Sequence, residues 1–195
     1  MKYIVTGGLG FIGSNLTDKL IEQGHQVIII DNLYSGYPEY RNPKSIWINK
    51  DIRDIDLNIS YRDVDAIFHL AAQARIQPSF KNPLETSAIN VLGPVKILEL
   101  ARITNAKLVY AGSSSFYGDP HKNPYALTKW MGEEQCKMYN EVYGVKTAIA
   151  RFFNVFGNRQ PESGENATVI GIFEKQRREG KPLTITGDGE KRRDF

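Results

Sequence analysis

The sequence predicts an α/β protein with a doubly wound parallel sheet and helices on both faces, and three observations lead to this prediction. Short apolar runs alternate with helix-like segments along most of the chain. The run at residues 27–30 is apolar at every position, as expected of a strand that is covered on both faces. Strand, helix and strand follow one another within the first 30 residues, and such a crossover is right-handed.

Before residue 157 we expect six strands, each of them a short apolar run bounded by polar residues or glycine. They lie at residues 2–6, 26–30, 45–48, 66–69, 107–111 and 146–151. Apolar residues at helical spacing predict helices at residues 16–23, 84–103, 125–139 and 168–178. Gly93-Pro94 predicts a kink or a restart in the second helix, whereas Asn123 and Pro124 suit the N-cap and first turn of the third.

The pattern changes after residue 157. Residues 158–166 are polar and contain glycine, a helix is expected next, and residues 182–186 read as a short strand. Because this is not another strand-helix-strand unit, we expect one domain over residues 1–157 and the beginning of a second over residues 158–195.

Composition excludes several classes of protein. The 195 residues carry 25 basic and 22 acidic side chains, a net charge of +3 that does not imply nucleic acid as a partner. The single cysteine, Cys136, allows no intrachain disulfide and no cysteine cluster for zinc, so we expect no metal. The sequence contains no signal peptide and no apolar run of membrane-spanning length, so we expect no membrane association and a cytoplasmic location.

Gly7, Gly10 and Gly13 form a Gly-x-x-Gly-x-x-Gly turn between the first strand and the first helix. Backbone amides at such a helix N-terminus can face a pyrophosphate, although glycines also end strands for purely structural reasons. Asp31 ends the second strand, about 20 residues further on, where a carboxylate accepts hydrogen bonds from ribose hydroxyls. Its charge would repel a 2′-phosphate. Together these residues predict a Rossmann-type domain that binds NAD in preference to NADP.

Three segments resemble the extended short-chain dehydrogenase/reductases, also called the NAD-dependent epimerase/dehydratase family. They are Thr6-Gly-Gly-Leu-Gly-Phe-Ile-Gly-Ser14, Asp31-Asn32-Leu33 and His69-Leu-Ala-Ala-Gln73, and the resemblance extends over nearly the whole chain. It is greatest toward the UDP-glucose 4-epimerases, which hold NAD on an N-terminal Rossmann domain and a UDP- or dTDP-sugar on a C-terminal domain. The resemblance therefore implies NAD as the cofactor, a nucleotide sugar, most simply a UDP-hexose, as the substrate, and a homodimer that pairs through the helices at 84–103 and 125–142.

The resemblance also assigns cofactor contacts to the glycine turn, the loop after the second strand, the segment Lys50-Asp51-Ile52, the His69 motif and the long helices. The residues concerned are Gly7, Gly10, Phe11, Ile12, Gly13, Asp31, Asn32, Ser35, Gly36, Asp51, Ile52, Leu70, Ala71, Ala72, Gln73, Asn90, Tyr125, Lys129 and Phe153.

Tyr125-Ala-Leu-Thr-Lys129 matches the family's Tyr-x-x-x-Lys, and its spacing puts both side chains on one helical face. The family's catalytic Ser or Thr stands four residues before a motif tyrosine, here Tyr117, which selects Ser113. The resemblance implies that Tyr125 takes a proton from a sugar hydroxyl that Ser113 hydrogen-bonds, while a hydride passes to NAD. Lys129 is expected to hold the nicotinamide ribose and, with the nicotinamide charge, to lower the Tyr125 pKa below its usual value of about 10.

The residues after Ser113 bear on the type of reaction. Dehydratases of the family place Asp-Glu directly after the catalytic Thr, and the decarboxylases place a Glu nearby, but this chain has Ser114 and Ser115. Neither serine can act as the acid or base of an elimination, so the resemblance favours a 4-epimerase, which returns the hydride to the opposite face of a 4-keto sugar. Substrate contacts are implied for Ser113, Ser114, Asn154 and Arg193, the last two on the diphosphate.

Two departures from the family keep other functions open. Seven residues separate Tyr117 from Tyr125, where the family has a longer loop, and the sequence ends at Phe195, where relatives continue into most of the substrate domain. We therefore expect an incomplete substrate domain, either as a naturally minimal enzyme or as part of a longer polypeptide. The alternatives are another nucleotide-sugar reaction, namely dehydration, decarboxylation or reduction, and a non-catalytic NAD-binding module.

Overall fold

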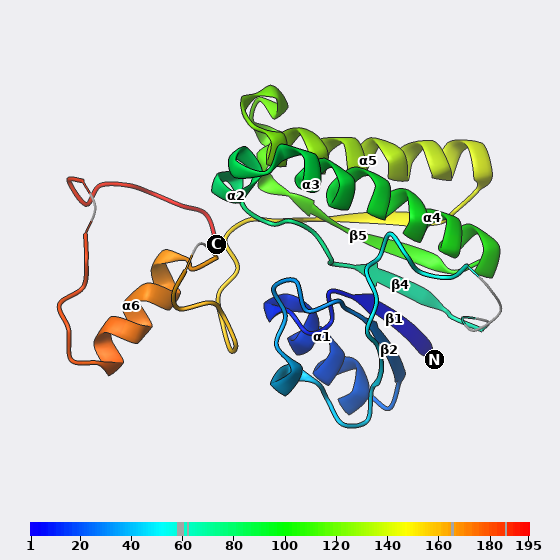
Figure 1. Cartoon of the computed structure of the whole chain (residues 1–195), viewed down its shortest axis with the longest axis horizontal. Coiled ribbons are helices and arrows are strands. Elements are labelled where there is room, and N and C mark those ends of the chain that lie inside the picture. The colour runs from blue at the N-terminus through cyan, green and yellow to red at the C-terminus, as the bar shows by residue number, and fades with distance from the viewer. Residues whose placement is uncertain (58–60, 62, 165, 186) are drawn as a thin grey trace.

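The computed structural model describes residues 1–57, 61, 63–164, 166–185 and 187–195. Its centre is a six-stranded parallel sheet in the order β3-β2-β1-β4-β5-β6 (Figure 1). The strands are β1 (Lys2–Thr6), β2 (Gln26–Ile30), β3 (Ile46–Ile48), β4 (Ala66–His69), β5 (Lys107–Ser113) and β6 (Thr147–Phe152). The strand order reverses between β1 and β4, which confirms the doubly wound fold and makes the carboxyl ends of these two strands the expected ligand crevice.

Helices cover the two faces of the sheet unequally (Figure 1). One face carries α2 (Ile76–Lys81), α3 (Pro83–Ser87), the π-helical turn η3 (Ala88–Leu92), α4 (Gly93–Thr104) and α5 (Pro124–Tyr143). The other carries α1 (Phe11–Glu22), and α6 (Val169–Arg178) lies to the side of the sheet. Short 3-10 turns are η1 (Pro38–Tyr40), η4 (Ser114–Tyr117) and η5 (Pro120–Lys122).

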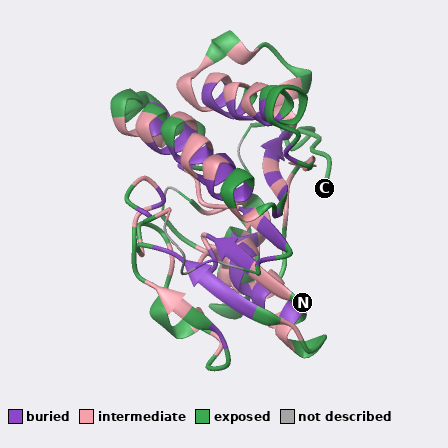
Figure 2. Cartoon of the chain, turned by 90° about the vertical axis from the view of Figure 1, so that its right-hand side faces the viewer, coloured by how far each residue is buried: buried purple, intermediate pink, exposed green. Residues whose placement is uncertain are grey.

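Successive residues of one strand enter separate cores on the two faces. Ile28 and Ile30 belong to the larger core beneath α4 and α5, whereas Val27 and Ile29 belong to a smaller core beneath α1. An uninterrupted apolar run is therefore buried on both sides, as the sequence predicted (Figure 2).

Several predicted boundaries change. The first helix begins at Phe11 and not at residue 16, because Gly10 is its N-cap and the Ser14 N–H already donates to the Gly10 carbonyl at 3.0 Å. The predicted interruption at Gly93-Pro94 is confirmed: five π-helical residues precede α4, and Pro94 has no N–H with which to continue an α-helical ladder. The Asn123 cap is also confirmed, since its side chain accepts from the Ala126 N–H at 2.8 Å.

The strand predicted at 182–186 is wrong as far as residues 182–185 are described, and Thr186 lies outside the described residues. No strand lies beside this segment in the described part of the chain. Instead the Thr184 N–H donates to Gln176 Oε1 at 3.1 Å, and Gln176 Nε2 donates to Thr184 Oγ1 at 2.7 Å. A β pattern without a ladder partner cannot form a sheet.

Among the described residues no helix has the length and apolar character to cross a membrane.

Candidate active site

The glycine turn requires glycine at two positions. Gly7 has a φ of +69°, and a Cβ there would lie 2.8 Å from the Ala71 nitrogen. A Cβ on Gly13 would lie 2.1 Å from the Gly7 carbonyl oxygen, so this residue lets α1 approach β1 closely. Because the N-cap Gly10 has no side chain, the first N–H groups of α1 remain available to an anion such as a pyrophosphate.

Asp31 is held at the carboxyl end of β2 by the backbone. Its Oδ2 accepts from the Leu9 N–H at 3.0 Å and its Oδ1 from the Leu33 N–H at 2.8 Å. Burial raises the pKa of this carboxyl, and the two backbone hydrogen bonds act against that rise. Each carboxylate oxygen has more than one acceptor site, so the pair can still accept from two ribose hydroxyls.

A small cavity of about 50 Å³ opens beside Asp31. The Asn32 side chain lies on the cavity wall and donates to Asp51 Oδ2 at 2.9 Å. Arg53 Nη2 also donates to Asp51 Oδ2, at 2.7 Å, and the hydrogen bonds from Arg53 lower the pKa of the Asp51 carboxyl. The structure thus brings together predicted cofactor residues from four separate segments. Those that line the cavity are Gly7, Asp31, Asn32, Ser35, Asp51, Ile52, Ala71 and Ala72.

Asn90 connects the cofactor side to the catalytic helix. Its Oδ1 accepts from the Gln73 N–H at 2.8 Å, and its Nδ2 donates to the Gln73 carbonyl at 3.0 Å and to Thr128 Oγ1 at 3.1 Å. This completely buried amide therefore connects the loop after β4 to α5. Its partner on α5 is Thr128, the residue before Lys129. The supporting role that the sequence suggested for Asn90 fits this geometry.

Ser113 and Tyr125 meet at the carboxyl end of β5. The Tyr125 hydroxyl donates to Ser113 Oγ at 3.3 Å, and the Ser115 hydroxyl donates to the same atom at 2.9 Å. The Tyr125 N–H donates to Ser79 Oγ at 3.2 Å, which attaches the first turn of α5 to α2. Two hydroxyl groups are thus held side by side, as general acid-base chemistry on a substrate hydroxyl requires.

Burial has the largest effect on the pKa values of both Lys129 and Tyr125. Burial lowers the pKa of Lys129 to about 8, and its Nζ lies 4.3 Å from the centroid of the Tyr110 ring. Burial raises the pKa of Tyr125, while the Ser113 hydrogen bond and the Arg75 charge act to lower it. Without NAD, burial is the largest influence on the Tyr125 pKa, and the expected joint effect of Lys129 and the nicotinamide charge stays a prediction.

Sequence reasoning missed Glu133, which lies one helical turn beyond Lys129. Its side chain is almost completely buried, and Arg151 donates to Glu133 Oε2 from Nε at 3.0 Å and from Nη2 at 2.8 Å. The guanidinium carbon of Arg151 in turn lies 3.3 Å from the centroid of the Phe116 ring. The signal was present in the sequence, since Tyr125, Lys129 and Glu133 follow one another at four-residue spacing.

Two further residues lie at the site, one from a motif that the sequence analysis named without giving this residue a role, and one from outside every motif. His69 is buried with its Nδ1 2.7 Å from Thr6 Oγ1, and burial lowers its pKa to about 3, so the ring is neutral. Arg75 lies near enough to Tyr125 to affect the phenol's pKa, and its Nη2 donates to the Asn166 carbonyl at 2.5 Å. No motif in the sequence identified Arg75.

Among the predicted substrate residues, Asn154 lies just beyond the end of β6. Asn154 donates to the Asp194 carbonyl from its backbone N–H at 3.2 Å and from Nδ2 at 2.7 Å, so exposed Arg193 is one residue from this contact. Phe153 stacks on Tyr117 with ring centroids 5.9 Å apart. Ser114 begins η4, directly after Ser113.

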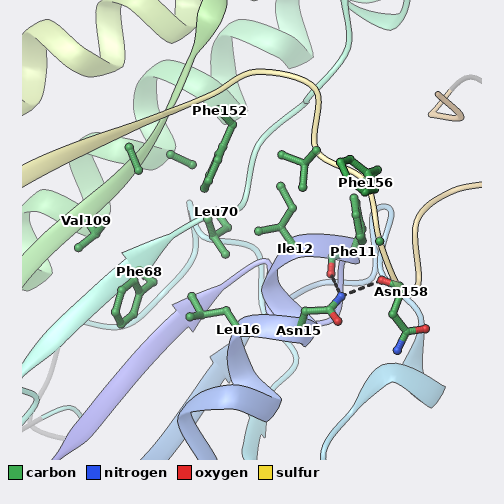
Figure 3. Close-up of a pocket in the computed structure, with 14 residues that line it drawn as sticks. Phe11, Ile12, Asn15, Leu16, Phe68, Leu70, Val109, Phe152, Phe156 and Asn158 are labelled. Atoms are coloured by element: carbon green, nitrogen blue, oxygen red, sulfur yellow. Dashed lines mark hydrogen bonds between the residues drawn. The ribbon is translucent and has the colours of Figure 1, made fainter. Parts of the chain in front are cut away.

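Three predicted cofactor residues direct their side chains elsewhere. Phe11, Ile12 and Leu70 line a groove on the α1 side of the sheet (Figure 3), so any cofactor contact from them comes from the backbone. Gly36 packs against Leu9, and a Cβ added to Gly36 would lie 3.0 Å from Leu9 atoms.

Among the described residues no group of three or more His, Cys, Asp or Glu side chains could hold a metal ion.

Comparison with known proteins identifies the family. The profile of the NAD dependent epimerase/dehydratase family matches residues 3–195. A protein of Methanocaldococcus jannaschii, provisionally named UDP-glucose 4-epimerase, is 44% identical over 208 positions that cover 98% of this chain and 68% of that protein. UDP-glucuronic acid decarboxylase 1 of Xenopus tropicalis is 34% identical and is matched by the whole chain over 50% of its length.

The fold comparison agrees. UDP-N-acetylglucosamine 4-epimerase from Methanobrevibacter ruminantium, solved with UDP-N-acetylmuramic acid, superposes with a TM-score of 0.92 at 37% identity, over 100% of this chain and 68% of that structure. The alignment with the Methanocaldococcus protein is longer than this 195-residue chain, so that relative carries residues within the matched region that this chain lacks. By profile, sequence and fold, the chain belongs to the NAD dependent epimerase/dehydratase family of nucleotide-sugar enzymes, whose cofactor is NAD.

Proposed function

We propose that this chain carries out NAD-dependent epimerisation of a nucleotide sugar at C4, of the UDP-glucose/UDP-galactose type, through a transient 4-keto sugar. The observation that carries the proposal is the hydroxyl pair of Ser113 and Tyr125, 3.3 Å apart at the carboxyl edge of the sheet. The glycine turn and Asp31 lie at the carboxyl ends of β1 and β2 on the same edge. One crevice can therefore hold a dinucleotide and a sugar together.

The residues present fit NAD. Gly7 and Gly13 leave the space that a Cβ would fill, the first turn of α1 offers N–H groups to the diphosphate, and Asp31 offers acceptors to the adenosine ribose. NAD bound by these residues would supply a hydride acceptor, and in its reduced form a hydride donor, for the sugar carbon. Asn90 keeps the backbone of Gln73 in place beside this site.

Tyr125 and Ser113 supply the proton chemistry in this proposal. Tyr125 takes the proton of the sugar 4-hydroxyl as the carbonyl forms and gives it back when the carbonyl is reduced. Ser113 Oγ, within hydrogen-bond distance of the phenol, holds the same sugar oxygen. Because burial raises the Tyr125 pKa, the phenolate depends on positive charge nearby, which Arg75 provides. In this proposal Lys129, one helical turn further along α5, adds to that charge when it is protonated.

A second reaction is favoured by the decarboxylase relatives, which match the whole chain at 34% identity. The side chains after Ser113 count against it. Ser114 and Ser115 have no group that ionises near neutral pH, and Ser115 already donates to Ser113. We therefore place decarboxylation and dehydration below epimerisation.

The test is a proton NMR time course of the purified chain with NAD and UDP-galactose. We expect the galactose anomeric signal to be replaced by that of UDP-glucose without net consumption of NAD. Formation of a 4-keto-6-deoxy sugar from UDP-glucose, or of a pentose from UDP-glucuronic acid, would refute epimerisation in favour of the corresponding reaction. Broadened nicotinamide signals without conversion of any of these sugars would indicate a non-catalytic NAD-binding module.

Homodimer formation and a cytoplasmic location also stay proposals. The outer faces of α4 and α5 and the turn before them expose apolar side chains that a second copy could cover, among them Leu92, Ile103, Met138 and Val142. Light scattering coupled to size-exclusion chromatography tests the dimer: we expect twice the 22.1 kDa chain mass, and reversion to the single mass in Val142→Glu.

A further inference from the structure

Lys129 is buried between α5 and the sheet, where little compensates its charge. Only 5% of the residue is exposed, and burial lowers its pKa to about 8. Its Nζ forms no hydrogen bond or ion pair with any described residue, and it faces the Tyr110 ring, whose centroid is 4.3 Å away. An ammonium that has lost its water needs another source of negative potential, and the face of an aromatic ring is one.

The other titratable groups that act on Lys129 from β4 and α5 are neutral or already paired. His69 is neutral because burial lowers its pKa to about 3. Cys136, two helical turns further along α5, keeps its proton because burial raises its pKa to about 12. Glu133 attracts the Lys129 charge, but Arg151 donates to its carboxylate at 3.0 and 2.8 Å. Among the described residues, the aromatic ring is therefore the direct partner left to the ammonium.

The position of the Tyr110 ring is fixed by β5 and α5. Tyr110 lies opposite His69 in the ladder between β4 and β5 and is almost completely buried. Gly132 of α5 leaves room for the ring, since a Cβ there would lie 2.1 Å from Tyr110 Oη. The Tyr110 hydroxyl has no hydrogen-bond partner among the described residues, and burying such a group is unfavourable. The hydroxyl therefore does not explain an aromatic residue here, whereas the ring face toward Lys129 does.

We propose that Tyr110 is a positioning residue whose ring face holds the Lys129 ammonium, through a cation–π contact, on the side of α5 that carries Tyr125. The face of the ring is negative, so the contact favours the charged lysine over the neutral amine. It thereby offsets part of the cost of burial and keeps Lys129 charged at neutral pH. The consequence for catalysis rests on the proposed function, whereas the contact itself does not.

The test is an NMR titration of the chain with carbon-13 at the Cε atoms of its lysines. The Lys129 signal is the one missing from Lys129→Met, and its midpoint should lie at about 8 in the unmodified chain. Tyr110→Phe keeps the ring face and, as the matched control, should keep this midpoint. Tyr110→pentafluorophenylalanine has a ring of nearly the same shape with an electron-poor face. Its midpoint should fall by about one pH unit, a tenfold change in the protonation equilibrium.

The pH profile of kcat/KM gives a second measurement. Its alkaline limb should move to lower pH with the fluorinated ring and stay in place in Tyr110→Phe. A chain that epimerises no sugar would refute the proposed function, and the lysine titration would still decide the role of Tyr110. An unchanged Lys129 midpoint with the fluorinated ring would overturn that role. An equal fall in both variants would also overturn it, since the hydroxyl and not the ring face would then stabilise the ammonium.

Discussion

The two faces of the sheet are built from neighbouring residues, yet one face is buried more completely than the other. On the side of α4 and α5, Ile67, Leu108 and Tyr110 are 0%, 1% and 1% exposed. On the opposite side the alternate residues Phe68 and Val109 stay partly exposed and line the groove. The covered face also carries the candidate catalytic residues, so the half of the molecule that needs exact geometry is the half that is already packed.

This difference separates two requirements of the molecule. Ser113, Tyr125, Lys129 and Asn90 are held by β5, α5 and η3 without help from the groove. The open face, by contrast, contributes none of these four residues. Variants on the two faces should therefore affect different properties.

The largest expected effect is on turnover. Tyr125→Phe removes the proposed acid-base hydroxyl, so we expect kcat to fall about 10³-fold while NAD affinity stays unchanged. The matched control is Tyr143→Phe, at the far end of the same helix, which should keep full activity. Activity by NMR and NAD binding by titration decide this; retained turnover in Tyr125→Phe means that the assigned base is wrong.

Lys129→Met should stabilise the fold. Burial lowers the Lys129 pKa from 10.5 to about 8, so the ammonium costs about 3 kcal/mol in the folded state. The cost is complete below pH 8 and disappears as the pH rises to 10.5, where the unfolded chain also loses its proton. Urea unfolding should show the variant more stable at pH 7, with the difference narrowing by pH 10; a constant difference would point to packing alone.

The two faces should respond differently to loss of side-chain volume. Leu108→Ala leaves a cavity in the closed core and should cost about 3 kcal/mol of unfolding free energy. Val109→Ala, at the next residue, should cost less than about 1 kcal/mol because its side chain faces the open groove. Urea unfolding of both variants measures this; equal losses would show that the groove face is covered in solution.

The smallest effect should come from Glu133→Gln. The Glu133 charge acts to keep Lys129 protonated, so its removal should lower the Lys129 pKa and move the alkaline limb of the kcat/KM profile to lower pH. Glu134→Gln is the control, because Glu134 is exposed and pairs with Lys137 at 2.6 Å. If both variants keep the original profile, Glu133 has only a structural role with Arg151.

Local features of the sequence predicted most of the framework. All six strands were identified, because an apolar run bounded by glycine or polar residues needs only its own neighbours to be recognised. The Asn123 cap and the interruption at Gly93-Pro94 are likewise properties of a few adjacent residues. The strand expected at 182–186 failed over its described part because a strand also needs a partner, and local pattern says nothing about one.

The candidate site divides in the same way. The sequence by itself determined which residues meet at the carboxyl edge of the sheet, since the glycine turn, Asp31, Ser113 and Tyr125 each end or begin an element there. Only the tertiary structure decided their electrostatics and their supports: the buried Lys129 with its lowered pKa, the raised pKa of Tyr125, and the hold of Asn90 on Gln73. Desolvation and long-range hydrogen bonds depend on what other segments pack against a residue, and that is a property of the whole fold.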